Sequence, residues 1–224
     1  MPVRPLLFSV FVGAAVLASV GGVAFAASGA PRKAFKPADL ALARSIVLRR
    51  SDLPAGFKAS PSSGSQAEAP RCKGFKPNES DLTLRGRASS PDFDTSGNPP
   101  LISSSADVWL NAAQAQADFA RVVRRGLDAC LFTLFGQGLT ASAAKGVKYL
   151  PVTHSLKPLA GLGQQATTVR LVFTGVSGNS RTAVIADFIA IRKDRVTALV
   201  TALNLRTPYP KTHQLAAIVA SRIP

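Results

Sequence analysis

The C-terminal half of the chain contains three runs of residues in which Val, Ile, Thr and Phe predominate. The runs cover residues 166–174, 181–191 and 195–205, and β-branched and aromatic residues favour strands. Only a few residues separate one run from the next, which is typical of an antiparallel meander. The middle run is apolar at both odd and even positions. We therefore expect it to be a central strand with both faces covered.

Asp187 interrupts one apolar face of this middle run. If the hairpin between the first two runs centres near Gly178, Asp187 lies opposite Arg170. A cross-strand ion pair there would offset the cost of a partly buried carboxylate. We interpret Arg170 and Asp187 as a structural ion pair, and a ligand-binding role for Asp187 is the alternative.

Three segments show the apolar periodicity of helices. A first helix is predicted from residue 38 to about residue 50, with Pro37 before it as a start signal. Asn111 is a natural N-cap for a long helix over residues 112–132. A last helix is predicted over residues 211–222.

Shorter alternating patterns add strands to the prediction. Residues 82–88 and 101–110 alternate as strands do, and a further strand is expected around residues 147–152. Trp109, at the end of the second pattern, is expected in the core. The order of elements predicts the α+β class, with one antiparallel sheet of about five to six strands packed against two to three helices in a single domain.

The first thirty residues have the composition of an export signal. Arg4 is the only charged residue before Arg32, and residues 6–26 are almost wholly apolar or small. A small-residue exit at residues 24–26 favours cleavage, which makes residues 1–26 a signal peptide. The alternative is an uncleaved N-terminal anchor, because roughly 20 apolar residues can span a bilayer. Both interpretations place the remaining chain outside the cytoplasm, secreted or in the cell envelope.

After this signal, we expect residues 27–36 to form a flexible basic segment and residues 37–224 to form the domain. The whole chain has 27 Lys and Arg against 12 Asp and Glu, a formal net charge of +15. Such an excess favours a polyanionic partner, and outside a cell the candidates are anionic lipid headgroups, anionic wall polymers and acidic glycans. Nucleic acid is not expected, because export separates the chain from it. The alternative is a surface of dispersed, solvated charges, since no run reaches five or six like charges.

The chain has two cysteines, Cys72 and Cys130. An even count is consistent with an oxidising compartment, and we predict one disulfide between them. Closing a loop of this length would stabilise the fold by about 4 kcal/mol. No metal site or cofactor is expected, because His154 and His213 are far apart and no Cys-x-x-Cys or His-x-x-x-His spacing occurs.

No residue arrangement typical of an enzyme is found, and we predict no catalytic residues. The sequence has no Gly-x-Ser-x-Gly elbow. His154 is expected in a loop and His213 on an exposed helix face. Paired carboxylates could come only from acids in polar, loop-like sequence, where acids are ordinarily solvated. These acids are Glu79, Asp81, Asp92 and Asp94.

Three arginines form the one candidate binding feature. Arg121, Arg124 and Arg125 are predicted on adjacent positions of the polar side of the long helix, where their guanidinium groups could meet a phosphate or a carboxylate. The alternative is a solvated helix face without a ligand.

Several segments together resemble a known family. They are the early helix ending in residues 52–57, Cys130 in the helix after Trp109, the glycine turn at residues 161–163, and the strands of residues 187–205 followed by a terminal helix. This arrangement resembles the PknH-like extracellular domain group, the sensor-like domains of actinobacterial secreted proteins, lipoproteins and receptor kinases.

The resemblance implies a mixed sheet-and-helix domain with a cleft and a disulfide, which binds an extracytoplasmic ligand. The chain departs from the group in having one possible disulfide in place of two, no lipid-attachment cysteine, and no kinase domain before the signal. We therefore expect an exported, non-enzymatic ligand-binding or sensor-like domain of the cell envelope. The alternative is a basic envelope protein that adheres to anionic lipid or wall polymer.

Overall fold

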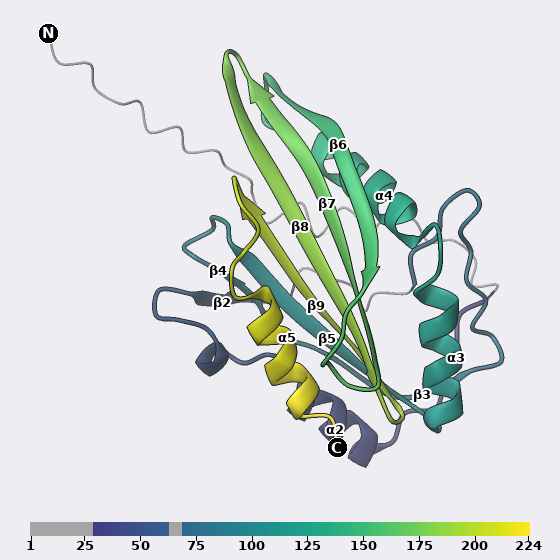
Figure 1. Ribbon diagram of the computed structural model, residues 1–224. Helices are drawn as coiled ribbons and strands as arrows, with labels where there is room; N and C mark the ends of the chain where they lie inside the picture. The colour runs from purple at the N-terminus through teal and green to yellow at the C-terminus, as the bar shows by residue number, and fades with distance from the viewer. Residues whose placement is uncertain (1–28, 63–68) are drawn as a thin grey trace, which may run out of the picture.

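The computed structural model describes residues 29–62 and 69–224 as one α+β unit (Figure 1). The predicted signal peptide, residues 1–26, lies outside the described residues. A single sheet has the strand order β1-β3-β5-β9-β8-β7-β6, and β2 and β4 extend it beside β5. All its pairings are antiparallel except that of β1 with β3.

The described residues form nine strands and four α-helices, and most strands follow one another in two runs, β2 to β5 and β6 to β9. The strands are β1 Arg32–Lys33, β2 Lys58–Ser60, β3 Thr83–Ser89, β4 Asp92–Asp94, β5 Leu101–Trp109, β6 Val147–Pro158, β7 Gln165–Ser177, β8 Ser180–Lys193 and β9 Val196–Leu205. The helices are α2 Pro37–Ile46, α3 Ala112–Val122, α4 Leu127–Ala141 and α5 Thr212–Ser221, with a short 3-10 helix at Arg50–Asp52. The prediction of five to six strands and two to three helices was therefore too low, although the class is as expected.

The predicted meander is present as β7, β8 and β9. β7 and β8 pair along their whole length, and this register sets Arg170 directly opposite Asp187. The Arg170 Nε atom lies 2.6 Å from one carboxylate oxygen of Asp187, and Nη2 lies 3.1 Å from the other. The structural ion pair predicted from the hairpin register is present.

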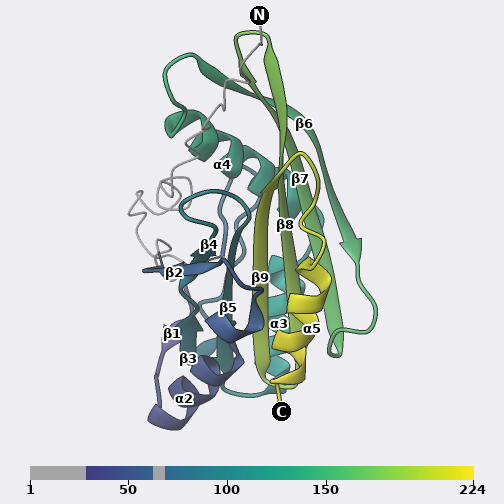
Figure 2. The same ribbon diagram turned by 90° about the vertical axis from the view of Figure 1, so that its left-hand side faces the viewer.

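Helices cover both faces of the sheet, as Figures 1 and 2 show. Odd positions of β8, Ile189 and Ile191, pack in one core cluster with α2 and α5. Even positions, Val184 and Ala186, pack in a second cluster with α4. The double-sided apolar pattern thus gives the central strand that the sequence predicts. Trp109 is fully buried in a third cluster, beside α3.

The structure corrects two of the predicted segments. The long helix over residues 112–132 is two helices, because Gly126 takes a φ of 95° as the N-cap of α4. A positive φ suits glycine and cannot continue a right-handed helix. The described part of the segment 27–36 is not a flexible arm, since β1 pairs with β3 in the sheet. The backbone N–H groups of Arg32 and Ala34 donate to Leu82 and Leu84.

The last helix, predicted over residues 211–222, is α5, and the first ends earlier than expected, at Ile46. Among the described residues, no helix is long and apolar enough to cross a membrane.

Gly86 allows α2 to lie close against β3. A Cβ atom at this position would lie 2.3 Å from the backbone oxygen of Asp39, in the first turn of α2. We predict that Gly86→Ala lowers the free energy of unfolding by about 1–3 kcal/mol, because α2 must move away from β3. Urea denaturation would measure the change. Ser89→Ala, at an exposed position of the same strand, is the control and should change stability by less than about 0.5 kcal/mol. Equal midpoints for the two variants would contradict the prediction.

Candidate functional site: a cationic hollow at the start of α4

A hollow of about 450 Å³ lies where the C-terminal end of α3 meets the segment that precedes β3. Three cationic side chains line it, Lys76, Arg121 and Arg124, together with one acidic side chain, Asp81. The rest of the lining is polar or small, and consists of Pro77, Asn78 and Ser80. The hollow therefore presents an excess of positive charge.

Arg121 is fixed in position by partners from the segment before β3. Its guanidinium donates to both carboxylate oxygens of Asp81, at 2.5 and 2.8 Å, and to the backbone oxygen of Asn78 at 2.8 Å. The hydrogen bond from Arg121 lowers the pKa of Asp81 to about 2. The pair thus stays ionised through the ordinary pH range, and it holds Arg121 at the wall of the hollow.

Arg124 is held by an aromatic ring. Its guanidinium carbon lies 5.2 Å from the centroid of the Phe75 ring, a cation–π distance. Phe75 is buried, whereas Arg124 is exposed, so the ring supports one face of the guanidinium and leaves its edge accessible. Phe75 also exchanges backbone hydrogen bonds with Cys72.

The three arginines predicted as an anion site do not share one helix face. Arg121 is in the last turn of α3, while Arg124 and Arg125 lie in the turn before α4, because α3 ends at Val122. Arg121 and Arg124 still line one hollow, but Arg125 is exposed and does not line it. Lys76, which the sequence did not single out, takes its place.

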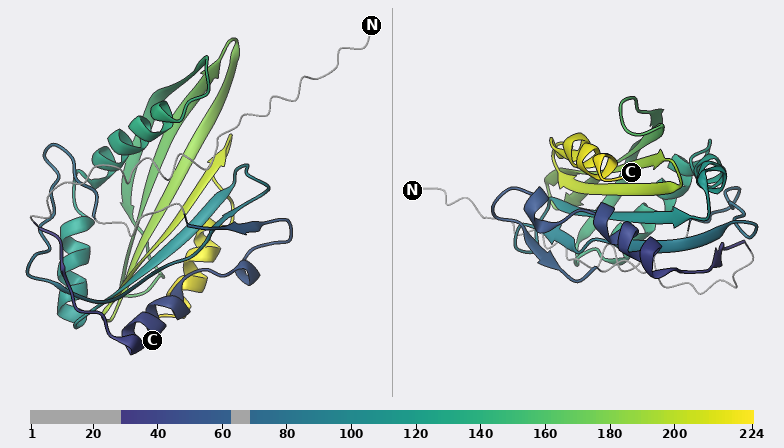
Figure 3. Two further views of the ribbon diagram at one scale, coloured as in Figure 1. Left: turned by 180° about the vertical axis from the view of Figure 1, so that it is seen from behind. Right: turned by 90° about the horizontal axis from the view of Figure 1, so that it is seen from below.

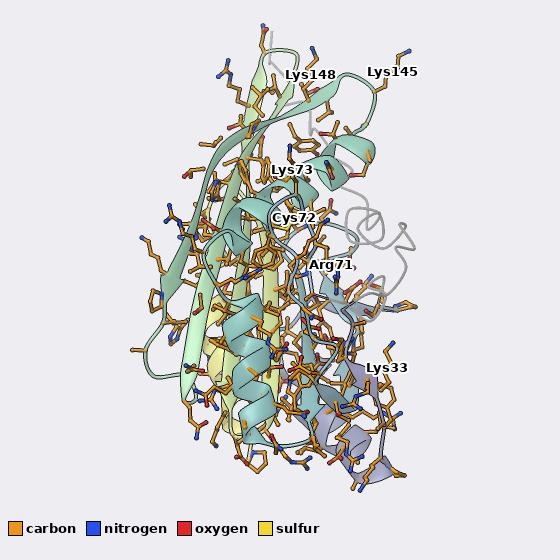
Figure 4. All side chains as sticks on the ribbon, turned by 90° about the vertical axis from the view of Figure 1, so that its right-hand side faces the viewer. Lys33, Arg71, Cys72, Lys73, Lys145 and Lys148 are labelled. Atoms are coloured by element: carbon orange, nitrogen blue, oxygen red, sulfur yellow. A yellow bond between two sulfur atoms is a disulfide. The ribbon has the colours of Figure 1, made fainter. Side chains whose placement is uncertain are left out.

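The predicted disulfide joins this segment to α4. Cys72 and Cys130 are bonded, with 5.6 Å between their Cα atoms. Cys130 is in the first turn of α4, so the bond places the residues that flank Cys72 beside the start of this helix. Figure 4 shows that the labelled cationic side chains Arg71 and Lys73 lie next to the disulfide, on the same side of the molecule as Lys145 and Lys148.

One buried carboxyl group, that of Asp118, lies one turn before Arg121 on α3. Asp118 is buried and accepts a hydrogen bond from Thr197, whose hydroxyl oxygen in turn accepts one from the Trp109 indole. Burial raises the pKa of Asp118 well above its ordinary value, and the charges of Glu79 and Asp107 raise it further. Arg87, which forms a two-bond ion pair with Asp107 at 2.6 Å, offsets part of this effect.

The expectation that four acids in loop-like sequence are solvated holds only for Asp81, which is exposed. Glu79, Asp92 and Asp94 are buried. Asp92 and Asp94 flank the buried Phe93 in β4, where pairing with β2 and β5 removes them from solvent.

A second, smaller hollow of about 310 Å³ lies on the other face of the sheet. The Arg170–Asp187 ion pair forms part of its floor, with Asp187 only 4% exposed and Arg170 48% exposed. The wall is formed by the chain before α5 and by its first turn, and includes Pro208, Tyr209 and His213. Because Asp187 engages the guanidinium, the pair contributes little net charge to this hollow.

The two histidines are well separated in the fold. His213 is exposed in the first turn of α5, as expected. His154 is not in a loop but in β6, where its Nδ1 atom lies 2.8 Å from Asp128 of α4 and its ring contacts Phe132. Within the described residues, no group of three or more His, Cys, Asp or Glu side chains is placed to hold a metal ion.

Comparison of the chain with family models, with curated proteins and with solved structures found no match. The resemblance to the PknH-like extracellular domain group therefore stays a prediction that rests on the sequence segments given above.

The buried Asp118 carboxyl predicts a pH dependence of stability. The pKa of Asp118 is higher in the folded state than in the unfolded state, so the protonated carboxyl group adds to the free energy of unfolding. This stabilisation is fully present below the unfolded-state pKa of about 3.9 and is lost as the pH rises through the folded-state pKa. We expect Asp118→Asn to be more stable than the wild type at neutral pH, by about 1.4 kcal/mol for each unit by which the pKa is raised. This advantage should disappear near pH 4. Urea midpoints between pH 4 and pH 8 would measure it.

Asp81→Asn is the matched control, because both its folded and unfolded pKa values lie below about 4. It should leave the slope of stability between pH 5 and pH 8 unchanged. If the free energy of unfolding of Asp118→Asn changes with pH in the same way as that of the wild type over this range, burial does not raise the pKa of the Asp118 carboxyl group.

Proposed function

We propose that this chain is an exported, non-enzymatic binding domain of the cell envelope, and that an anionic ligand binds at the cationic hollow. The observation that carries the proposal is the placement of Arg121 and Arg124. Each guanidinium is held by its own support, Arg121 by Asp81 and Arg124 by the Phe75 ring, and both line one hollow. A cation that is already positioned loses less conformational entropy when a ligand binds.

The charges that line the hollow favour an anion. Asp81 neutralises one of the three cations, Arg121, and leaves the charges of Lys76 and Arg124 for a ligand. Phosphate and carboxylate groups accept short, charge-assisted hydrogen bonds from guanidinium and ammonium groups. The nearby acids are engaged with the protein itself, Asp81 with Arg121 and Asp118 with Thr197, which supports a binding role.

The disulfide supports an extracytoplasmic location, because such bonds persist in oxidising compartments. It also attaches the segment that carries Lys76 to α4, so a reduced chain would hold the hollow less firmly. In this proposal, the Cys72–Cys130 disulfide both fits the extracytoplasmic location and stabilises the hollow.

A second candidate function is adhesion to an anionic lipid surface without a particular site. Exposed lysines that share one side of the molecule favour it, and they include Lys33, Lys73, Lys145 and Lys148 (Figure 4). The two functions differ in how they depend on individual residues. Binding at the hollow requires Lys76 and Arg124, whereas surface adhesion depends on the total charge of the face.

Pyrophosphate, as a compact anionic probe, tests the proposal. We expect the double variant Lys76→Ala with Arg124→Ala to bind it about tenfold more weakly or worse, because charge-assisted hydrogen bonds are lost. The control is Arg44→Ala with Lys211→Ala, which removes the same charge from exposed positions on the α2 and α5 side. Isothermal titration calorimetry at low and at high salt would give the affinities.

The control should retain wild-type affinity at each salt concentration. Equal losses in the two double variants would indicate a general charge effect and overturn the proposal. Absence of pyrophosphate binding at low salt, where screening is weakest, would overturn it as well.

A further inference from the structure

α4 separates two groups of cationic residues. Arg124 and Arg125 precede its N-terminal end, and the disulfide holds Lys73 near its first turn. Lys145 and Lys148 follow its C-terminal end, in the turn before β6 and in β6 itself. All five side chains are exposed. Figure 4 shows Lys73, Lys145 and Lys148 along the same side of the molecule.

The length of α4 sets the separation of the two groups. The helix has 15 residues, which at 1.5 Å per residue corresponds to about 22 Å. A small anion in the hollow cannot reach Lys145 or Lys148 over this distance. Only an extended ligand can contact both groups at once.

The exposed surface of α4 between the two groups carries no charged side chain. Its exposed side chains are small or neutral and polar, and they recur every three or four residues, so they form one stripe along the helix. They are Ala129, Thr133, Gln137, Thr140 and Ala141. The acid of the first turn, Asp128, faces His154 in β6. Among the described residues of α4, a negatively charged chain would therefore meet no opposing carboxylate along the stripe.

We propose that the ligand is a linear polyanion that runs from the cationic hollow along the exposed stripe of α4 to Lys145 and Lys148. This inference rests on the proposed function, because the hollow is one end of its path. A polymer fits better than a membrane, since a hollow admits a flexible chain but not a flat surface. The two separated cationic groups also match charges that repeat along a chain. Contacts at both ends would add in one molecule, which raises its affinity above that of either end alone.

Linear polyphosphate of two lengths tests the inference. We expect a chain of several tens of phosphates to bind at least tenfold more tightly per molecule than pyrophosphate, since it engages both groups. Lys145→Ala with Lys148→Ala should remove most of this gain and leave pyrophosphate binding unchanged. Lys76→Ala with Arg124→Ala should weaken both ligands.

A matched pair of charge insertions tests the path itself. Gln137→Glu places a carboxylate in the middle of the stripe, and Gln214→Glu places the same group on the exposed face of α5, on the other side of the sheet. We expect Gln137→Glu to weaken long-chain binding severalfold, and Gln214→Glu to leave it unchanged. Both positions are exposed helix residues, and thermal unfolding would check that both variants remain folded.

The outcomes separate the two proposals. If pyrophosphate binds at the hollow but the long chain gains nothing, or if Gln137→Glu has no effect on the long chain, the polymer inference fails and the proposed function stands. If neither ligand binds, both fail. If vesicles rich in phosphatidylglycerol bind and lose affinity in the Lys145→Ala, Lys148→Ala variant, while polyphosphate binding does not change, the face is a membrane surface and the polymer inference is overturned.

Discussion

Both faces of β8 are apolar, and the burial of both faces determines where the helices lie. Ile189 and Ile191 require cover on one side of the sheet, which α2 and α5 provide, and Val184 and Ala186 require cover on the other, which α4 provides (Figures 1 and 3). Removing apolar surface from water stabilises the folded state by about 25 cal/mol for each Å² that is buried. The cover that the helices provide is therefore the main source of stability in the sheet. Polar groups are left at the ends of the helices and in the chain between them, and the cationic hollow lies in such a place.

The same constraint explains which elements the sequence predicts. β5, β7, β8, β9 and α5 have long, regular patterns because each buries at least one continuous face. β1, β2 and β4 are not predicted, since they are too short for a periodicity and Asp92 and Asp94 suggest a polar loop. They form strands because backbone N–H and C=O groups of a neighbouring strand pair with them. The local sequence does not show which strand will lie beside them.

The break between α3 and α4 has a different cause. Residues 112–132 keep a helical composition across Gly126, and a glycine inside a helix costs only about 1 kcal/mol, so the pattern predicts one helix. The chain turns there because two shorter helices can each pack on the sheet, α3 near Trp109 and α4 over Leu171. This turn moves Arg124 off the helix and towards Phe75.

The candidate site was therefore predicted in part. Arg121 and Arg124 are predicted from their adjacent positions on the polar side of one long helix, and the Cys72–Cys130 bond from the even cysteine count. Lys76 could not be identified, because the chain around it has no periodicity and its position follows from the disulfide.

The charge of the site also depends on the turn. Gly126 points the N-terminal end of α4, the positive end of its dipole, towards the side that carries Arg124. The opposite end is negative, and Lys145 and Lys148 follow it, so their charges offset the dipole there. If the proposed ligand binds, backbone geometry and side-chain charge would act together to attract it to both ends of α4.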